Sequence, residues 1–346
     1  MQIIFDVLIP VFAIILCGIL AGIYKVVDVS GSKSLNNFVY YIALPALLFL
    51  SLAEAPVSYL TNWGFLFTNL FGILTSFLVA SILSLLVFKR KFPNVATYGM
   101  AASYGTTGYM GVPLLIAAFG QTAALPAALA TLIHNIPVII IVTISFELYR
   151  ALKQTSYREV ARAVGSGDAI IPGTVSQEKP NIGTILLNVI KSVFLSPLTI
   201  SVLAGIIVAV SNIQLPKSAL VFSQLLSDAA GPTALFALGL GLVGQGKLFT
   251  KLAINKAEVT IIIISKIIVQ PLVTLFLALY VFQLEGIWLT ATIIMSALPV
   301  GAGAYVFAQK YESFKEETSV SIVISMLISI VTISLLLVLS ERGYFL

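Results

Sequence analysis

The chain has 346 residues, of which 59% are hydrophobic and only 10% are charged, and its formal net charge is +5. An ordinary soluble domain carries about 25% charged residues, so this composition excludes one. The single cysteine, Cys17, excludes an intramolecular disulfide, and a chain with a single histidine cannot build a Cys/His metal cluster. We expect no metal and no cofactor.

Apolar segments long enough to cross the ~30 Å hydrocarbon core of a membrane as helices recur along the whole chain. The first is not followed by a small-residue cleavage site, so we expect it to be retained and not removed as a signal peptide. The sequence predicts an all-α integral membrane protein with ten spans, at residues 3–24, 34–53, 62–88, 96–119, 123–149, 187–210, 218–244, 259–283, 287–308 and 319–340.

The basic residues gather in alternate loops between these spans. Placing the N-terminus outside puts most of the 19 lysine and arginine residues in cytoplasmic loops, including the Lys89–Lys91 cluster. This asymmetry follows the positive-inside rule, so the positive charge does not indicate nucleic-acid binding. We predict a multi-pass protein of the cell membrane with both termini outside and the polar segment 152–181 in the cytoplasm.

The two halves of the chain repeat the same pattern of proline and glycine residues. Each half holds five spans, an odd number, so the halves insert with opposite orientation, as in inverted-repeat carriers. We predict a first repeat at 1–151, a cytoplasmic linker at 152–181 and a second repeat at 182–346. Shifting the first half by 187 residues places Pro10 on Pro197, Gly18 on Gly205, and Pro45–Phe49 on Pro232–Phe236, and a shift of 186 places Pro113 on Pro299.

Several segments resemble the auxin efflux carrier family, which includes plant carriers and bacterial relatives described as malonate or organic-anion transporters. The resemblance covers essentially all ten spans. The segments that carry it are Leu35–Glu54, Leu226–Leu240, Gly111–Leu115 and Ser296–Glu312.

The resemblance implies two inverted five-helix repeats, with spans four and nine broken and crossing each other. It also implies a scaffold of spans one, two, six and seven, a mobile domain of the other six, elevator-type motion and a homodimer. Many relatives carry asparagine where this chain has Thr106, and the plant carriers have an aspartate and a lysine in span three, where this chain offers Asn69. These differences argue against auxin itself as the substrate.

Pro113 and Pro299 lie inside spans four and nine, and a proline in a helix interior removes a backbone hydrogen bond. A broken helix leaves unpaired N–H groups at the positive end of its second half, where an anion binds without a basic side chain. We expect the second halves to open at these prolines and to hold a carboxylate. The alternative is that each proline merely kinks a packed helix. The predicted substrate-binding residues here are Thr106, Thr107, Tyr109, Gly111, Val112, Pro113, Pro299, Val300 and Gly301.

His134 and Asn135 lie in span five, at a polar position that in the family looks like a substrate-supporting site. Because imidazole titrates near neutral pH, His134 is a candidate to carry a coupling proton or to donate to an anion. The alternative is a neutral core histidine satisfied by a neighbouring carbonyl.

Asp228 in span seven and Lys266 in span eight are the deepest ionisable residues of the predicted spans. A charge within the membrane is costly unless it is paired or hydrated, so both are candidates for coupling or charge pairing. A direct pair would neutralise both, and structural neutralisation and proton coupling both remain open.

The function predicted from these features is secondary transport of a small organic anion, such as malonate or an auxin-like weak acid, across a membrane. The expected partners are therefore the substrate and lipid, and the resemblance implies a second copy of the chain as well. A sodium-coupled carrier that resembles bile-acid transporters is an alternative, as is an anion channel or a non-transporting sensor. The sequence has no GxxxxGK[ST] pattern, nucleophile elbow or zinc motif, which argues against ATP-driven transport by this chain and against an enzyme.

Overall fold

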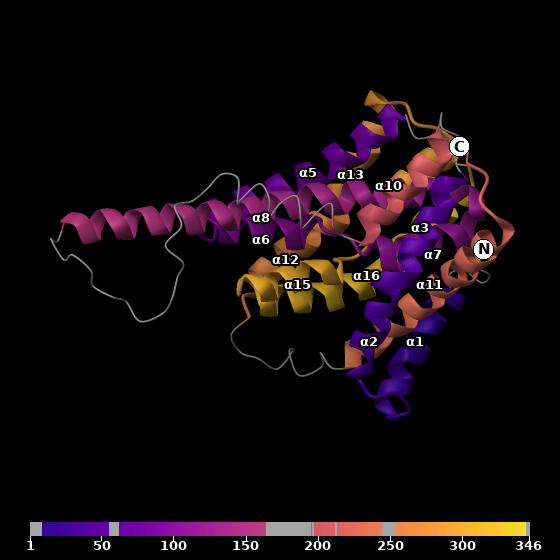
Figure 1. Cartoon of the computed structure of the whole chain (residues 1–346). Helices are drawn as coiled ribbons and strands as arrows, with labels where there is room; N and C mark the ends of the chain where they lie inside the picture. Colours follow the sequence, from indigo (N-terminus) through magenta and orange to yellow (C-terminus); the bar gives the residue numbers. More distant parts are fainter. Residues whose placement is uncertain are drawn as a thin grey trace.

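The computed structural model describes residues 9–54, 62–163, 195, 197–211, 213–243 and 254–343, which are helical apart from short connections (Figure 1). The α-helices are α1 (Ile9–Ile23), α2 (Gly31–Phe38), α3 (Leu44–Ala53), α5 (Trp63–Leu86), α6 (Asn94–Ser103), α7 (Val112–Phe119), α8 (Ala124–Ala163), α10 (Pro197–Val210), α11 (Lys217–Val243), α12 (Lys256–Ile264), α13 (Gln270–Phe276), α14 (Gly286–Ser296), α15 (Ala302–Lys310) and α16 (Lys315–Glu341).

Six apolar helical segments in the described part of the chain are long enough to cross a membrane, and four more are shorter. Each of the ten predicted spans overlaps one of these segments. The prediction of an all-helical membrane protein is therefore confirmed. The long segments are Gly31–Ala53, Trp63–Leu86, Gln121–Phe146, Lys217–Val243, Lys256–Val281 and Lys315–Ser340, and the shorter ones are Phe12–Ile23, Thr107–Phe119, Pro197–Val210 and Gly286–Ser296.

Three prolines are accommodated inside helices by a π-helical turn that ends two residues earlier. A proline has no N–H, and its ring clashes with the carbonyl of the preceding turn. A π turn widens the helix locally and redirects these carbonyls, which relieves the clash without ending the helix. The turns are η2 (Val39–Ala43) before Pro45, η3 (Thr107–Gly111) before Pro113, and η6 (Ser265–Val269) before Pro271.

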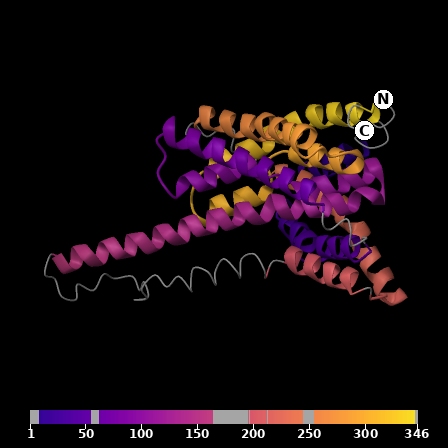
Figure 2. The same cartoon turned by 90° about the horizontal axis from the view of Figure 1, so that it is seen from above.

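The helices pack in two groups. The α1, α2–α3, α10 and α11 helices contact one another, whereas α5, α6 and α12–α16 form a second set of mutual contacts, which α8 joins. In Figure 2 the indigo and salmon helices of the first group lie on one side of the magenta α8, and the orange and yellow α12–α16 lie on the other. The first group is built from the predicted spans one, two, six and seven.

The contacts within the first group repeat between the two halves of the chain. The α1 helix packs against α11 so closely that a methyl group on Gly18 would clash with the carbonyl of Phe236. The α10 helix packs in the same way against α3, where a Cβ on Gly205 would lie 2.7 Å from the carbonyl oxygen of Phe49. Adding 187 to Gly18 and to Phe49 gives Gly205 and Phe236, so the sequence offset relates two equivalent contacts.

The α8 helix is much longer than the predicted fifth span. It continues through Ala163 and projects beyond the rest of the bundle (Figures 1 and 2). The first residues of the predicted linker 152–181 are therefore helical, and its remainder lies outside the described residues.

Candidate functional site

Two helices of the bundle are interrupted, and the interruptions pair with each other. The chain is not helical at residues 104–106, the first break, or at 297–301, the second break. The backbone N–H of Thr106 donates to the carbonyl of Pro299 (3.1 Å), and the N–H of Gly301 donates to the carbonyl of Tyr104 (2.9 Å). These two bonds form an antiparallel bridge between the breaks, which satisfies backbone groups that lipid could not.

Glycine permits this close approach. A Cβ on Gly301 would lie 2.6 Å from the carbonyl oxygen of Gly105, and one on Gly303 would lie 2.6 Å from the ring of Tyr104. Contacts this short are not made by side chains, so the backbones could not pair with larger residues at these positions. Gly111 is similarly confined, because a Cβ on it would lie 2.5 Å from the side chain of Leu298 in the second break.

The two prolines do not occupy equivalent positions, and the expectation that the second half-helix opens at the proline is wrong for Pro113. Pro299 lies within the second break, before α15 begins, but Pro113 lies six residues after Thr107, where the helix following the first break begins. The π turn η3 absorbs Pro113, whose ring packs against α11, 3.1 Å from where a Cβ on Gly231 would lie. For Pro113 the structure shows the alternative, a proline inside a packed helix.

The backbone donors at the breaks also differ from the expectation. The N–H groups of Thr106 and Gly301 are used in the bridge, and that of Val300 donates to the Ser325 hydroxyl (3.1 Å) on α16. Within the described part of the chain, no side chain caps the start of η3. Since the first N–H groups of a helix have no partner within it, the donors left for a ligand are those of 107–109 and 302–303.

Three buried polar groups near the first break have atoms with no hydrogen-bond partner in the described part of the chain: the Thr107 hydroxyl, His134 Nδ1 and Asn135 Oδ1. Thr131 lies 3.8 Å from where a Cβ on Gly108 would lie, so this part of α8 faces η3. Asn135 is four residues later and shares that face. The structure thus brings Thr107 and Asn135 to neighbouring helices, while Tyr109 is half-buried and Val112 is buried in the core.

His134 is 1% exposed and is held from the other side by Asn69 of α5. The amide nitrogen of Asn69 donates to the carbonyl of Phe65 (2.9 Å) and to the hydroxyl of Thr292 (3.1 Å). Its oxygen therefore faces His134 Nε2 at 3.1 Å, which makes Nε2 the protonated nitrogen. A neutral His134 then presents Nδ1 as an acceptor, and a protonated one presents it as a donor. The partner is a side-chain amide and not a carbonyl of the main chain.

Lys266 is fully buried beside the breaks. Its ammonium group donates to the carbonyl of Ser296 (2.8 Å), where α14 ends, and to Gln270 Oε1 (3.0 Å). The suggested pair with Asp228 is not formed in this structure. Asp228 is exposed on α11 and accepts a hydrogen bond from Gln224 (2.7 Å).

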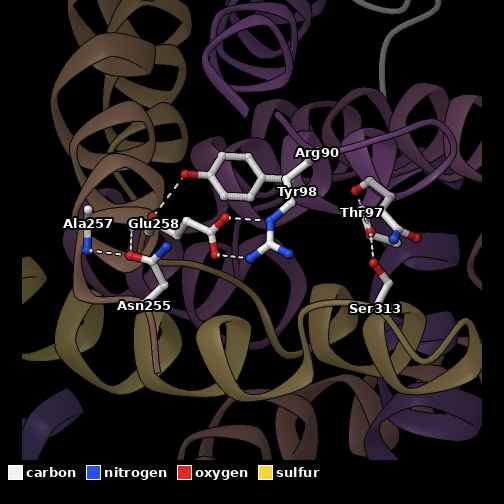
Figure 3. A network of polar contacts seen from close by, with 8 residues as sticks. Arg90, Thr97, Tyr98, Asn255, Ala257, Glu258 and Ser313 are labelled. Atoms are coloured by element: carbon white, nitrogen blue, oxygen red, sulfur yellow. Dashed lines mark hydrogen bonds and ion pairs between the residues drawn. The ribbon is translucent and has the colours of Figure 1, made fainter. Parts of the chain in front are cut away.

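One ion pair was not predicted from the sequence, in which Arg90 belongs to a cytoplasmic charge cluster. Arg90 donates to both carboxylate oxygens of Glu258 at 2.7 and 3.0 Å (Figure 3). The guanidinium carbon of Arg90 also lies 5.0 Å from the ring centroid of Phe314. The hydrogen bonds to Glu258 raise the pKa of Arg90 above its ordinary value. Glu258 occupies the first turn of α12, where the helix dipole favours a negative charge, and Asn255 caps that turn. The pair joins the loop after α5 to α12.

A cavity of about 600 Å³ lies between the two helix groups. Its lining includes polar residues at four helix ends: Glu54 after α3, Thr122 before α8, Gln224 near the start of α11, and Trp288 near the start of α14. All four ends belong to the side of the membrane that the charge pattern predicts to be outside.

Comparison with known proteins identifies the family. A model of the family described as "Membrane transport protein" matches residues 3–337. A protein of Rhizobium meliloti (strain 1021) named "Putative malonate transporter" is 29% identical over 337 residues, which cover 96% of this chain and 95% of that protein. Auxin efflux carrier component 8 of Arabidopsis thaliana is 25% identical over 372 residues, 94% of each chain. The mouse protein named "Lysosomal cholesterol signaling protein" is 26% identical across 94% of this chain but only 36% of its own length. With a match that spans nearly all its residues, the chain belongs to the membrane transport protein family of auxin efflux carriers, and it is a transporter and not an enzyme.

Proposed function

We propose that the protein is a secondary carrier of a small organic anion with at least one carboxylate. The paired breaks carry this proposal, because they bring the beginnings of two half-helices next to each other. Half-helix N-termini of this kind bind anionic substrates in carriers with broken helices. The relative named for malonate transport supports a short carboxylic acid as the substrate.

Side chains around the first break would orient the anion. The Thr107 hydroxyl can donate to a carboxylate oxygen, and the Asn135 side chain lies on the neighbouring helix face. His134 contributes a donor at Nδ1 only when it is protonated, because Asn69 holds the other nitrogen. Binding of an anion at Nδ1 therefore couples to a proton on His134. In the neutral state the same atom would accept from a protonated acid.

The transport mechanism we propose is alternating access by elevator-type motion. The group of α1–α3, α10 and α11 would form the scaffold, and the helices that carry the breaks would move past it. The equivalent contacts of Gly18 and Gly205 support two inverted repeats. The cavity at the predicted outer side supports access from outside in this conformation. We further propose a homodimer in the cell membrane, with both termini outside and the linker 152–181 in the cytoplasm.

Transport by the purified protein in proteoliposomes tests this function. Malonate, other mono- and dicarboxylates and an indole carboxylate would be offered on a solid-supported membrane and as radiolabelled acids, with and without pH or sodium gradients. We expect saturable transport of a carboxylate. Failure of every acid, in both assays and with folded, inserted protein, would overturn the carrier proposal, and a current that does not saturate would indicate a channel.

Two variants and one control test the proposed binding site in this assay. Thr107→Val removes one donor without changing the shape of the side chain and is expected to weaken apparent affinity about tenfold. Thr260→Val, on an exposed face of α12, is the matched control and should behave as the wild type. His134→Gln keeps a donor toward Asn69 but cannot be protonated, so any dependence of transport on a pH gradient should disappear with it.

A further inference from the structure

The amine of Lys266 lies in the predicted membrane core without a negative partner among the residues that the structure describes. Its side chain is 0% exposed, and its two hydrogen-bond acceptors, Ser296 O and Gln270 Oε1, are both neutral groups. A buried charge is costly unless an opposite charge compensates it. A protonated Lys266 would therefore need a counter-charge that the described residues do not supply.

The surroundings of Lys266 also leave two hydrogen-bond donors unused. An ammonium group has three N–H donors and no acceptor, and two are used. Because Lys266 can only donate, it fixes the orientation of the Gln270 amide with the oxygen toward Nζ. The Gln270 amide nitrogen must therefore point elsewhere, and it is buried without a hydrogen-bond partner among the described residues. Two unused donors, one of them charged, complement a carboxylate.

This pair of donors lies beside the paired breaks. The carbonyl of Ser296 that binds Lys266 ends α14 directly before the second break. On the other side, a Cβ on Gly105 in the first break would lie 3.3 Å from Lys266 Nζ. Lys266 therefore lies next to both breaks, where its charge acts on a ligand through a low-dielectric medium.

We propose that Lys266 and Gln270 form an anion site on the α12–α13 side of the breaks, which binds one carboxylate of the substrate. This rests on the proposed carrier function and deepens it. The ammonium supplies the charge that the half-helix dipoles lack, and the Gln270 amide donates to the second carboxylate oxygen. With His134 neutral, the buried site would then carry one positive charge when empty and no net charge when it holds a monovalent anion. No coupling cation is needed to compensate such a substrate.

The test measures binding of malonate, and of formate as the minimal carboxylate, to the purified protein by isothermal titration and by ligand-induced thermal stabilisation. In Lys266→Met we expect affinity for both acids to fall at least about tenfold, since a charged hydrogen-bond partner of the ligand is lost. The unliganded protein should melt no lower than wild type, because an uncompensated buried charge is removed. Lys256→Met, at the exposed start of the same span, is the matched control and should bind as the wild type.

Gln270→Glu provides an independent variant. The new carboxylate lies where Lys266 already donates, so it should supply the missing counter-charge from within, raise the melting temperature and reduce affinity for both acids at least about tenfold. A merely structural Lys266 would not change the electrical behaviour. Exchange of a monovalent acid should be independent of membrane potential in the wild type and dependent on it in Lys266→Met.

The outcomes separate the two proposals. If the wild type transports an acid while Lys266→Met binds it within about twofold of wild-type affinity, the Lys266–Gln270 site is wrong and the carrier function stands. A Gln270→Glu protein that keeps wild-type affinity would also overturn the site. If the wild type neither binds nor transports any acid, the carrier proposal falls, and the site falls with it.

Discussion

The chemical role of a buried polar side chain in a membrane core depends on its hydrogen-bond partner. His134 could be selected by residue type alone, as the only histidine and within a span. Its partner Asn69 is 65 residues away and lies on another helix, so no local pattern connects them. The same holds for Lys266, whose i+4 spacing to Gln270 is readable on one helix face, while its bond to Ser296 depends on how α14 packs.

Arg90 and Glu258 form an ion pair in which replacing one residue should cost more stability than replacing the other. The side chain of Arg90 is 42% exposed and that of Glu258 is 0% exposed. Arg90→Met leaves a buried carboxylate unpaired and should lower the free energy of unfolding by about 3 kcal/mol or more. Glu258→Gln leaves a guanidinium that water can solvate, so a loss nearer about 1 kcal/mol is expected.

Chemical or thermal unfolding in detergent would measure both variants beside Lys91→Met, an exposed neighbour of Arg90 that should change stability little. Equal losses for Arg90→Met and Glu258→Gln would contradict the assignment of the buried partner as the costly one.

At the scale of elements, the clearest feature is the duplicated close contact between helices of the two halves. The repeated pattern of prolines and glycines predicted that Gly18 and Gly205 are equivalent. The structure places Gly18 against the carbonyl of Phe236 and Gly205 against that of Phe49, the equivalent phenylalanine. Spans four and nine follow the pattern less closely. The prolines matched there by sequence are not equivalent, because a π turn allows Pro113 to remain within its helix while Pro299 lies in a break.

The duplicated contact gives a prediction for a pair of variants. Gly18→Ala and Gly205→Ala each insert a methyl group against a backbone carbonyl, which must separate the two helices and should cost about 1–3 kcal/mol in each case. Melting temperatures in detergent would compare them with Gly31→Ala, whose new methyl group would meet only the Val27 side chain at 3.3 Å. A large loss at one site and none at the other would argue against equivalent repeats.

At the scale of the whole molecule, the orientation in the membrane remains a prediction from charge. On a Cys17→Ser background, Lys217→Cys at the start of α11 should react with a membrane-impermeant maleimide in intact cells. Lys91→Cys, between α5 and α6, should react only after permeabilisation. Both positions are exposed in the structure. The reverse labelling pattern would invert the predicted topology and place the 600 Å³ cavity on the cytoplasmic side.

The sequence by itself determined that this is an all-helical membrane protein and indicated its family. Both follow from properties of the linear sequence, since in lipid each apolar segment must form its backbone hydrogen bonds internally, as a helix does. The positions of the breaks and the partners of Asn69, Lys266 and Glu258 were decided only by the tertiary structure. A helix can end inside the membrane only where another backbone replaces the lost hydrogen bonds, and the pairing of Thr106 with Pro299 joins segments almost 200 residues apart.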